Sequence, residues 1–470
     1  MRNVDFPYIY RLLGFLAFCA PFPASSGNSW AAALTHKDRI FADRVIAIPI
    51  AFLFNVAARI LGKVMRRDHT ITSSNVDRIV VAKLIGMGSI LQATPLLKAL
   101  KQHYPRAIVT FVTMQANREL LTRLSCVDEI IVLDDRNVFV MTVTTMRAVA
   151  ALFRQRADLY FDLEVYSAFS SLLALSAATR NRIGFYRHSV NFKRGIYTHL
   201  VYFNTRMSIR QLYLQLGRVA GVPAGQSDLI GPIRVDYSAK ASVLRFLEKS
   251  SLSQQSGPFP YIVVNPNASD LLLERRWPSE YFIETLSRLV DLGHHVALIG
   301  MKSELPYVQS LFDRLTPEVQ SKVVNTAGHL NLGELLALLD GAACVLTNDT
   351  GPMHMSIALQ RPTVCLFGPA NPEHYGQELD YVEIFYSQVF CSPCLYEADE
   401  PPCHGNNVCM RQIQPDAVIR AVLRLAAPGP REKISRFGKR STDVILSDAA
   451  DGTPLGLVVR ASLKPVGNAQ

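Results

Sequence analysis

The segment with the clearest chemical signature is residues 346–355, LTNDTGPMHM, which join an apolar run to a helical pattern. Thr350 or Gly351 suits the N-cap of that helix, and Pro352 suits its first turn. Free backbone N–H groups and the positive end of the helix dipole favour an anion at such a turn. We therefore expect a pyrophosphate site here, with His354 able to reach the same anion. A capped turn that binds no ligand is the alternative interpretation.

Composition narrows the compartment and the class of partner. The net charge of +10 favours an anionic partner, but no basic stripe with interleaved aromatic residues indicates nucleic acid. Eight cysteines in 470 residues are too few for a disulfide scaffold and indicate a reducing compartment. Cys391, Cys394, Cys403 and Cys409 begin as a C-x-x-C pair, yet the later spacings match no standard zinc module. Reduced thiols or a labile disulfide are expected there, with structural zinc as the alternative.

The elements that must position these residues follow a strict α/β alternation. The polar stretch 250–258 is typical of a linker, so a boundary is expected near residue 255 between domains 71–255 and 256–425. Helices are expected at 278–292 and 332–339, and no fold is expected for the tail 426–470. Two Rossmann-like halves predict a ligand in the cleft between them, at the carboxyl ends of the parallel strands. The expected strands are residues 78–84, 107–113, 129–133, 158–165, 182–186, 261–265, 295–300, 322–325, 343–348 and 363–367.

The turn NDTGPMH at 348–354, with the strand and turn 363–369 and Asn371-Pro372 after it, resembles the signature of glycosyltransferase family nine, the heptosyltransferases. Other segments resemble that family in the same order: RIVVAKLIGMGS at 78–89, ATP at 93–95, VVNPNA at 263–268, RRWP at 275–278 and the cysteine segment that ends at 409–410. The resemblance covers about residues 78–425. It implies a GT-B fold and an inverting, metal-independent transfer of heptose from an ADP-sugar to a growing lipopolysaccharide core.

The resemblance also implies where the donor binds. Arg275 takes the place of a family lysine that neutralises the phosphates, although a solvated surface charge is the alternative for Arg275 and more so for Arg276. A cation and a helix N-terminus are suitable partners for the charge that develops on the departing ADP. The expected donor-binding residues are Asp349, Thr350, Gly351, His354, Arg275 and Asn267.

The N-terminal domain is expected to receive a phosphorylated glycolipid acceptor. Gly86 and Gly88 of the glycine loop are one part of that expected site. Arg182 and Arg187 are the other part, within a cation-rich stretch around Gly184 that also contains Arg180, His188, Lys193 and Arg194. A run of this kind fits a solvated loop equally well.

The catalytic base is where the chain departs from the family pattern. Many relatives have an aspartate directly after the glycine loop, and this chain has Ser89, whose hydroxyl is far too weak a base at neutral pH. Asp162 and Glu164 end a predicted strand and therefore lie on the cleft side of the sheet. We expect Glu164 to act as the base and Ser89 to position the acceptor. A capping or buried carboxylate is the alternative for both acids.

Residues 1–70 are expected to associate with a membrane surface. The apolar stretches 12–20 and 45–54 are each too short to span a bilayer. The second continues into a helical pattern with Arg59, Lys63, Arg66 and Arg67, which is typical of a helix in the membrane interface. This predicts peripheral attachment to the cytoplasmic face of the inner membrane. A secretory signal in residues 1–30 and an ordinary buried helix at 45–61 are the alternatives.

Other functions stay open at this point. A family relative could transfer another sugar from another nucleotide, and a membrane-attached binding protein could have kept the fold without the chemistry. A nucleotide-dependent dehydrogenase is disfavoured, because no G-x-G-x-x-G with a following acidic residue accompanies the first strand.

Overall fold

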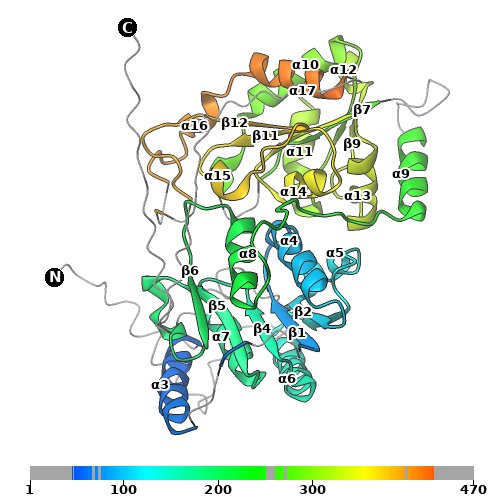
Figure 1. Cartoon of the computed structure of the whole chain (residues 1–470). Coiled ribbons are helices and arrows are strands. Elements are labelled where there is room, and N and C mark those ends of the chain that lie inside the picture. The colour runs from blue at the N-terminus through cyan, green and yellow to red at the C-terminus, as the bar shows by residue number, and fades with distance from the viewer. Residues whose placement is uncertain are drawn as a thin grey trace, which may run out of the picture.

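The chain forms two α/β halves that meet along a layer of helices (Figure 1). The computed structural model describes residues 45, 47–65, 69–71, 76–249, 260–268, 272–395, 397–398 and 401–427. The predicted linker centre at 255, the signal-like segment 12–20 and the tail beyond 427 lie outside the described residues.

The N-terminal sheet is parallel throughout, with strand order β3-β2-β1-β4-β5-β6. Its central strands are almost entirely buried, as expected for a parallel sheet that is covered on both faces. The strands are β1 (Arg78–Ala82), β2 (Ile108–Met114), β3 (Glu129–Leu133), β4 (Leu159–Asp162), β5 (Asn181–Tyr186) and β6 (His199–Tyr202).

Helices cover both faces of this sheet. One face carries α4 (Met87–His103), α5 (Arg118–Leu121) and α8 (Ile209–Val219), packed on Ile79, Val81 and Phe111 of the sheet. The opposite face carries α3 (Ile48–Met65), α6 (Val138–Gln155) and α7 (Ala168–Ser176), packed on Val80 and Val112. The alternation of side chains along each strand produces this division.

The C-terminal sheet repeats the same topology, with parallel order β12-β11-β10-β7-β8-β9. Its strands are β7 (Tyr261–Asn265), β8 (His295–Leu298), β9 (Val323–Asn325), β10 (Cys344–Asn348), β11 (Thr363–Phe367) and β12 (Val382–Tyr386). The helices of this half are α9 (Tyr237–Lys249), α10 (Ser279–Asp291), α11 (Leu305–Phe312), α12 (Pro317–Gln320), α13 (Leu332–Gly341), α14 (Gly351–Ala358), α15 (Pro372–Tyr375), α16 (Val408–Arg411) and α17 (Pro415–Ala426).

One hydrophobic core joins the two halves. The layer of α4 and α8 belongs to the same buried cluster as α13 and α14 of the C-terminal half. Gly231 lies in this junction, with positive φ, and its N–H donates to Thr94 Oγ1 of α4 at 2.8 Å. A Cβ at Gly231 would lie 2.5 Å from the carbonyl oxygen of Ala358, so the close approach of the two halves there requires glycine.

The predicted α/β alternation and the two parallel sheets are confirmed, but two strands and the place of one helix differ from expectation. The edge strands β6 and β12 were not predicted, and neither has the continuous buried run of the central strands. Helix α9 precedes the expected boundary at 255, yet it packs on α13 of the C-terminal half. Lys240 pairs with Asp340 at 2.6 Å, and Ser242 donates to Glu334 at 2.6 Å. The C-terminal half therefore begins before α9.

Helix α3 confirms the helical pattern that was expected after residue 45. It packs against α7 and the segment 188–193, and its Asn55 side chain donates to the Phe192 carbonyl at 2.5 Å. Among the described helices, none combines the length and apolarity that crossing a bilayer requires.

Adjacent residues of α6 should differ sharply in their effect on stability. Leu152 is fully buried against the sheet, whereas Phe153 is 58% exposed. We expect Leu152→Ala to lower the free energy of unfolding by about 2–5 kcal/mol, because it opens a cavity in the core. Phe153→Ala is the matched control and should change it by less than about 0.5 kcal/mol. Urea unfolding followed by circular dichroism measures both, and equal effects would contradict the packing of α6 described above.

Candidate active site

Each sheet brings its candidate residues to one point. In both sheets the strand order reverses at the first strand, between β1 and β4 and between β7 and β10. Ligands of doubly wound sheets bind beyond the carboxyl ends of the strands at such a point. The loops that leave β1 and β4 carry the glycine loop and Glu164, and those that leave β7 and β10 carry Asn267 and the Asp349–His354 turn.

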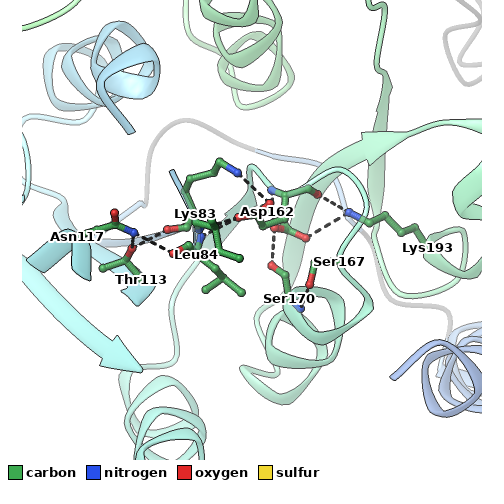
Figure 2. Close-up of polar contacts among 10 residues, drawn as sticks. Lys83, Leu84, Thr113, Asn117, Asp162, Ser167, Ser170 and Lys193 are labelled. Atoms are coloured by element: carbon green, nitrogen blue, oxygen red, sulfur yellow. Dashed lines mark hydrogen bonds and ion pairs between the residues drawn. The ribbon is translucent and has the colours of Figure 1, made fainter. Parts of the chain in front are cut away.

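The loop that follows β1 is held from both sides (Figure 2). Thr113 Oγ1 donates to the Lys83 carbonyl at 2.8 Å, and Asn117 Nδ2 donates to the Leu84 carbonyl at 2.9 Å. From the other side, Glu164 Oε1 accepts the N–H groups of Leu84 at 2.8 Å and Ile85 at 3.2 Å. Buried backbone groups of a loop need such partners, and here they fix the path of the chain into α4.

Glu164 is the residue that was expected to act as the base, and three donors contact its carboxylate, which leaves one acceptor position on Oε2. Besides the two amides, its Oε2 pairs with Lys83 Nζ at 2.8 Å. Burial raises the pKa of Glu164, but Lys83 and the two amide donors outweigh burial and hold the pKa below its usual value. The group is therefore ionised at neutral pH and is a weak base.

Asp162 is fully buried beside Glu164, whose backbone N–H donates to Asp162 Oδ1 at 3.0 Å (Figure 2). Its carboxylate accepts from Ser170 Oγ at 2.6 Å and from the Tyr197 hydroxyl, and Lys193 Nζ lies 3.5 Å away. Lys193 also donates to the Glu164 carbonyl. These contacts give Asp162 a structural task beneath the loop that carries Glu164. They also place Lys193, one of the cations considered for the acceptor, entirely inside the domain.

Gly86, Gly88 and Ser89 form the entry to α4. Gly86 has φ +94° and is the N-cap of the helix, a conformation that L side chains rarely adopt. A Cβ at Gly88 would lie 2.4 Å from His354 Cδ2, so the C-terminal turn packs directly on the backbone here. Ser89 is half-buried in the first turn of α4. The structure thus brings the two glycine-containing turns of the chain together.

The Asp349–His354 turn is ordered by an amide beneath it. Of the two expected residues, Thr350 is the N-cap of α14, but its hydroxyl makes no capping bond. It accepts instead from Asn265 Nδ2 at 2.8 Å and lies 3.2 Å from the Asn348 carbonyl. The N-terminal N–H groups of α14 therefore receive no partner from the Thr350 side chain, which suits an anion at this end of the helix.

Arg275 and Asp349 face each other, whereas Arg276 points elsewhere. Arg275 Nη2 lies 3.2 Å from Asp349 Oδ2, with both side chains largely buried. Burial raises the pKa of Asp349, and Arg275 opposes part of that effect. Arg276 stacks over the Tyr307 ring at 4.0 Å from its centroid. The arginine expected at the phosphate thus adjoins the turn, and its neighbour does not.

Asn267 lies beside the same turn. Its Nδ2 donates to the Ile299 carbonyl at 2.9 Å, and its own carbonyl accepts from Asn348 Nδ2 at 3.0 Å. The Asn267 Oδ1 atom is buried and has no hydrogen-bond partner among the described residues.

Two candidate site residues were not predicted from the sequence. Gln92 of α4 and Arg210 of α8 are both buried at the junction of the two halves, and Gln92 contacts His354. Arg210 Nη1 donates to Gln92 Oε1 at 2.9 Å and to the Gly376 carbonyl at 2.9 Å. Gln92 Nε2 lies 2.7 Å from the Tyr375 carbonyl and 3.3 Å from His354 Nδ1. A polar residue within the apolar run of α4 was the available signal for Gln92.

This network fixes the tautomer of His354. A guanidinium only donates, so Gln92 must turn its oxygen to Arg210 and its NH₂ group to His354. His354 Nδ1 is then an acceptor, and the proton of the neutral ring is on Nε2. Burial, with smaller contributions from Arg210 and Arg275, lowers the pKa of His354 to about 3. The ring is therefore a neutral Nε2–H donor at physiological pH, beside Gly88.

The two arginines expected to contact the acceptor differ in position. Arg182 lies at the amino end of β5, and its guanidinium donates to the carbonyls of Ile196 and Thr179. That end of the sheet is opposite the glycine loop, so the contacts of Arg182 are structural ones. Arg187 follows β5 at the carboxyl end and donates to the Tyr166 hydroxyl, over whose ring it lies.

The described cysteines are all free thiols, and Cys391, Cys394 and Cys403 are half-buried while Cys409 is buried. Within the part of the chain that the structure describes, no three His, Cys, Asp or Glu side chains are arranged to hold a metal ion.

Comparison with known proteins identifies the family of the chain and several similar proteins. The family model described as glycosyltransferase family 9 (heptosyltransferase) matches residues 146–404. Lipooligosaccharide heptosyltransferase 2 of Haemophilus influenzae is 31% identical over 142 residues, which are 30% of this chain and 40% of that protein. Lipopolysaccharide heptosyltransferase 2 of Salmonella typhimurium is 26% identical over 63% of this chain and 84% of its own length. The solved structure of E. coli ADP-heptose lps heptosyltransferase II shares the fold, with TM-score 0.61 and 21% identity over 74% of this chain and 98% of that one.

The tautomer of His354 can be observed directly. In protein labelled with ¹⁵N-histidine, we expect the Nδ1 of His354 to resonate as an unprotonated nitrogen and Nε2 as a protonated one between about pH 5 and pH 8. Gln92→Glu should shift the proton toward Nδ1, because a carboxylate accepts where the amide donated. His329→Gln, at an exposed histidine of the same half, assigns the background without disturbing this signal. A protonated Nδ1 in the wild-type protein would contradict the network.

Proposed function

Since the chain belongs to glycosyltransferase family 9, the heptosyltransferases, we propose that it moves a heptose from an ADP-sugar to the lipopolysaccharide core, with inversion at the anomeric carbon. The observation that carries this proposal is the contact between the two turns, where His354 of the C-terminal half lies against Gly88 of the N-terminal half. A donor on one turn and an acceptor on the other would meet there. Holding the two reactants in the reactive geometry lowers the entropic part of the activation barrier.

The donor would bind to the C-terminal turn. The N-terminus of α14 and Arg275 would face the diphosphate, and Asp349 would hold the Arg275 guanidinium in place. Thr350, Gly351 and Asn267 would line the same site. Positive charge and N–H dipoles set in advance stabilise the charge that grows on ADP as the bond to the anomeric carbon breaks. The proposed reaction needs no cofactor besides the ADP-sugar, which is consumed as co-substrate.

The acceptor would approach the entry to α4. Its hydroxyl oxygen attacks the anomeric carbon while its proton passes to a base, and ADP leaves on the opposite side of the sugar. We keep Glu164 as the proposed base, because it is ionised and lies at the carboxyl end of β4 beside the glycine loop. Ser89 would orient the hydroxyl, and Arg187 would contact an anionic group of the acceptor.

The proposed acceptor is a phosphorylated glycolipid, so the enzyme would work at a membrane. We propose peripheral attachment at the cytoplasmic face of the inner membrane, where nucleotide sugars are available. Helix α3 supports this, because Phe52, Leu53 and Ile60 are exposed on it.

A direct assay tests the activity. Purified full-length protein should release ADP from ADP-heptose only when heptose-deficient lipopolysaccharide is present, and mass spectrometry should show that the acceptor gains one heptose. UDP- and GDP-sugars serve as controls for the nucleotide. Release of UDP or GDP instead would reassign the donor, and no release with any nucleotide sugar would favour a binding protein without catalysis.

The role of Glu164 can be separated from its structural contacts. Glu164→Gln retains an oxygen for the two loop amides but cannot take a proton, so turnover should fall about 100-fold or more. Lys83→Gln is the matched control: it removes the ion pair and leaves the carboxylate, so turnover should fall much less. Because the pKa of Glu164 is lowered, the wild-type rate should persist into acid below the usual carboxylate range. Wild-type turnover in Glu164→Gln would rule out this base and direct attention to Ser89→Ala and Asp162→Asn.

A further inference from the structure

A second apolar surface adjoins α3 on the N-terminal half. Helices α3, α7 and α6 share one buried cluster and cover the same face of the N-terminal sheet, with α7 in contact with both others. In Figure 1 this layer lies on the side of the sheet away from the C-terminal half. The opposite face, with α4 and α8, is the one that meets the C-terminal half.

Helix α6 presents an apolar stripe to solvent. Phe139, Met146 and Phe153 are exposed by 75%, 67% and 58% and recur at seven-residue spacing. That spacing places all three on one side of the helix. The inner side of α6 is buried, because Ala148 and Leu152 pack into the core. Large apolar side chains that are exposed together in a row are typical of a site that binds a protein or a membrane.

The charged residues of α3, α6 and α7 indicate what kind of partner this surface binds. None of the residues of α3, α6 and α7 is acidic. Arg147 and Arg154 each follow a residue of the α6 stripe and are exposed. An apolar stripe beside cations, on helices that carry no acidic residue of their own, suits anionic lipid headgroups, which attract each nearby cation. A second copy of the chain would bring the same positive charge against itself.

We propose that the α3–α7–α6 layer is a membrane-docking face, in which α6 inserts Phe139, Met146 and Phe153 beside α3 into an anionic lipid surface. The purpose of such a face, access to a lipid-anchored acceptor, rests on the proposed function. The structural observations for the face do not depend on that function. Docking through two helices fixes the orientation of the N-terminal half on the membrane. The C-terminal half then stays on the side away from the lipid (Figure 1).

Vesicle flotation of the full-length protein tests the face. Wild type should bind vesicles that contain phosphatidylglycerol and bind phosphatidylcholine vesicles much more weakly. We expect M146E/F153E in α6 and F52E/L53E in α3 each to lower the fraction bound by about ten-fold or more. F390E is the matched control, because Phe390 is a fully exposed phenylalanine of the C-terminal half, and it should bind as wild type does.

Three results would overturn the proposal. Unchanged flotation of M146E/F153E would exclude α6 from the face, even if F52E/L53E floats less. Equal binding to both kinds of vesicle would remove the role of the cations. A lipid-free wild-type dimer that M146E/F153E converts to monomer, with no vesicle binding by either, would assign the face to a second copy. ADP release with a soluble acceptor, measured on the same samples, separates these outcomes from failure of the proposed activity.

Discussion

The structure depends on one constraint, the parallel connection of every strand in both sheets. A parallel strand must return through a crossover, so all carboxyl ends of a sheet lie on one edge and the loops that leave them gather there. In this chain the strand order reverses beside β1 and again beside β7, which is the point where doubly wound sheets bind their ligands. The candidate site residues lie in the loops that leave those strands. The packing of α4 against α14 then brings the two edges to one junction.

Buried polar groups keep this junction rigid. The loop after β1 has its carbonyls satisfied by Thr113 and Asn117 and its amides by Glu164, so its position follows from hydrogen bonds. Gln92 and Arg210 do the same for His354 from the other half of the molecule. Unpaired polar groups are costly in such a place, so the hydrogen bonds that these residues make favour one arrangement over others. A site ordered in this way offers its donors without rearrangement when charge develops.

The N-terminal half has two faces with different tasks. The face of α4 and α8 is buried against the C-terminal half, and it contributes the glycine loop to the junction. The face of α3, α7 and α6 buries its inner side in the core and leaves apolar side chains and cations outside. The proposed docking face combines α3 with α6, a crossover helix of the sheet itself, so membrane attachment would be built onto the fold that carries the site.

The sequence by itself determined the α/β class, ten of the strands, a helix that begins at Thr350 or Gly351 and the family, because these depend on local periodicity and on short motifs. It missed the edge strands β6 and β12, which lack a continuous apolar run, and it assigned α9 to the wrong half because only packing on α13 decides that. It treated Arg182 and Arg187 alike, and the sheet placed them at opposite ends. Only the tertiary structure joined Gln92, Arg210 and His354, since residues separated by more than one hundred positions have no shared pattern in sequence and are brought together by the contact of two domains.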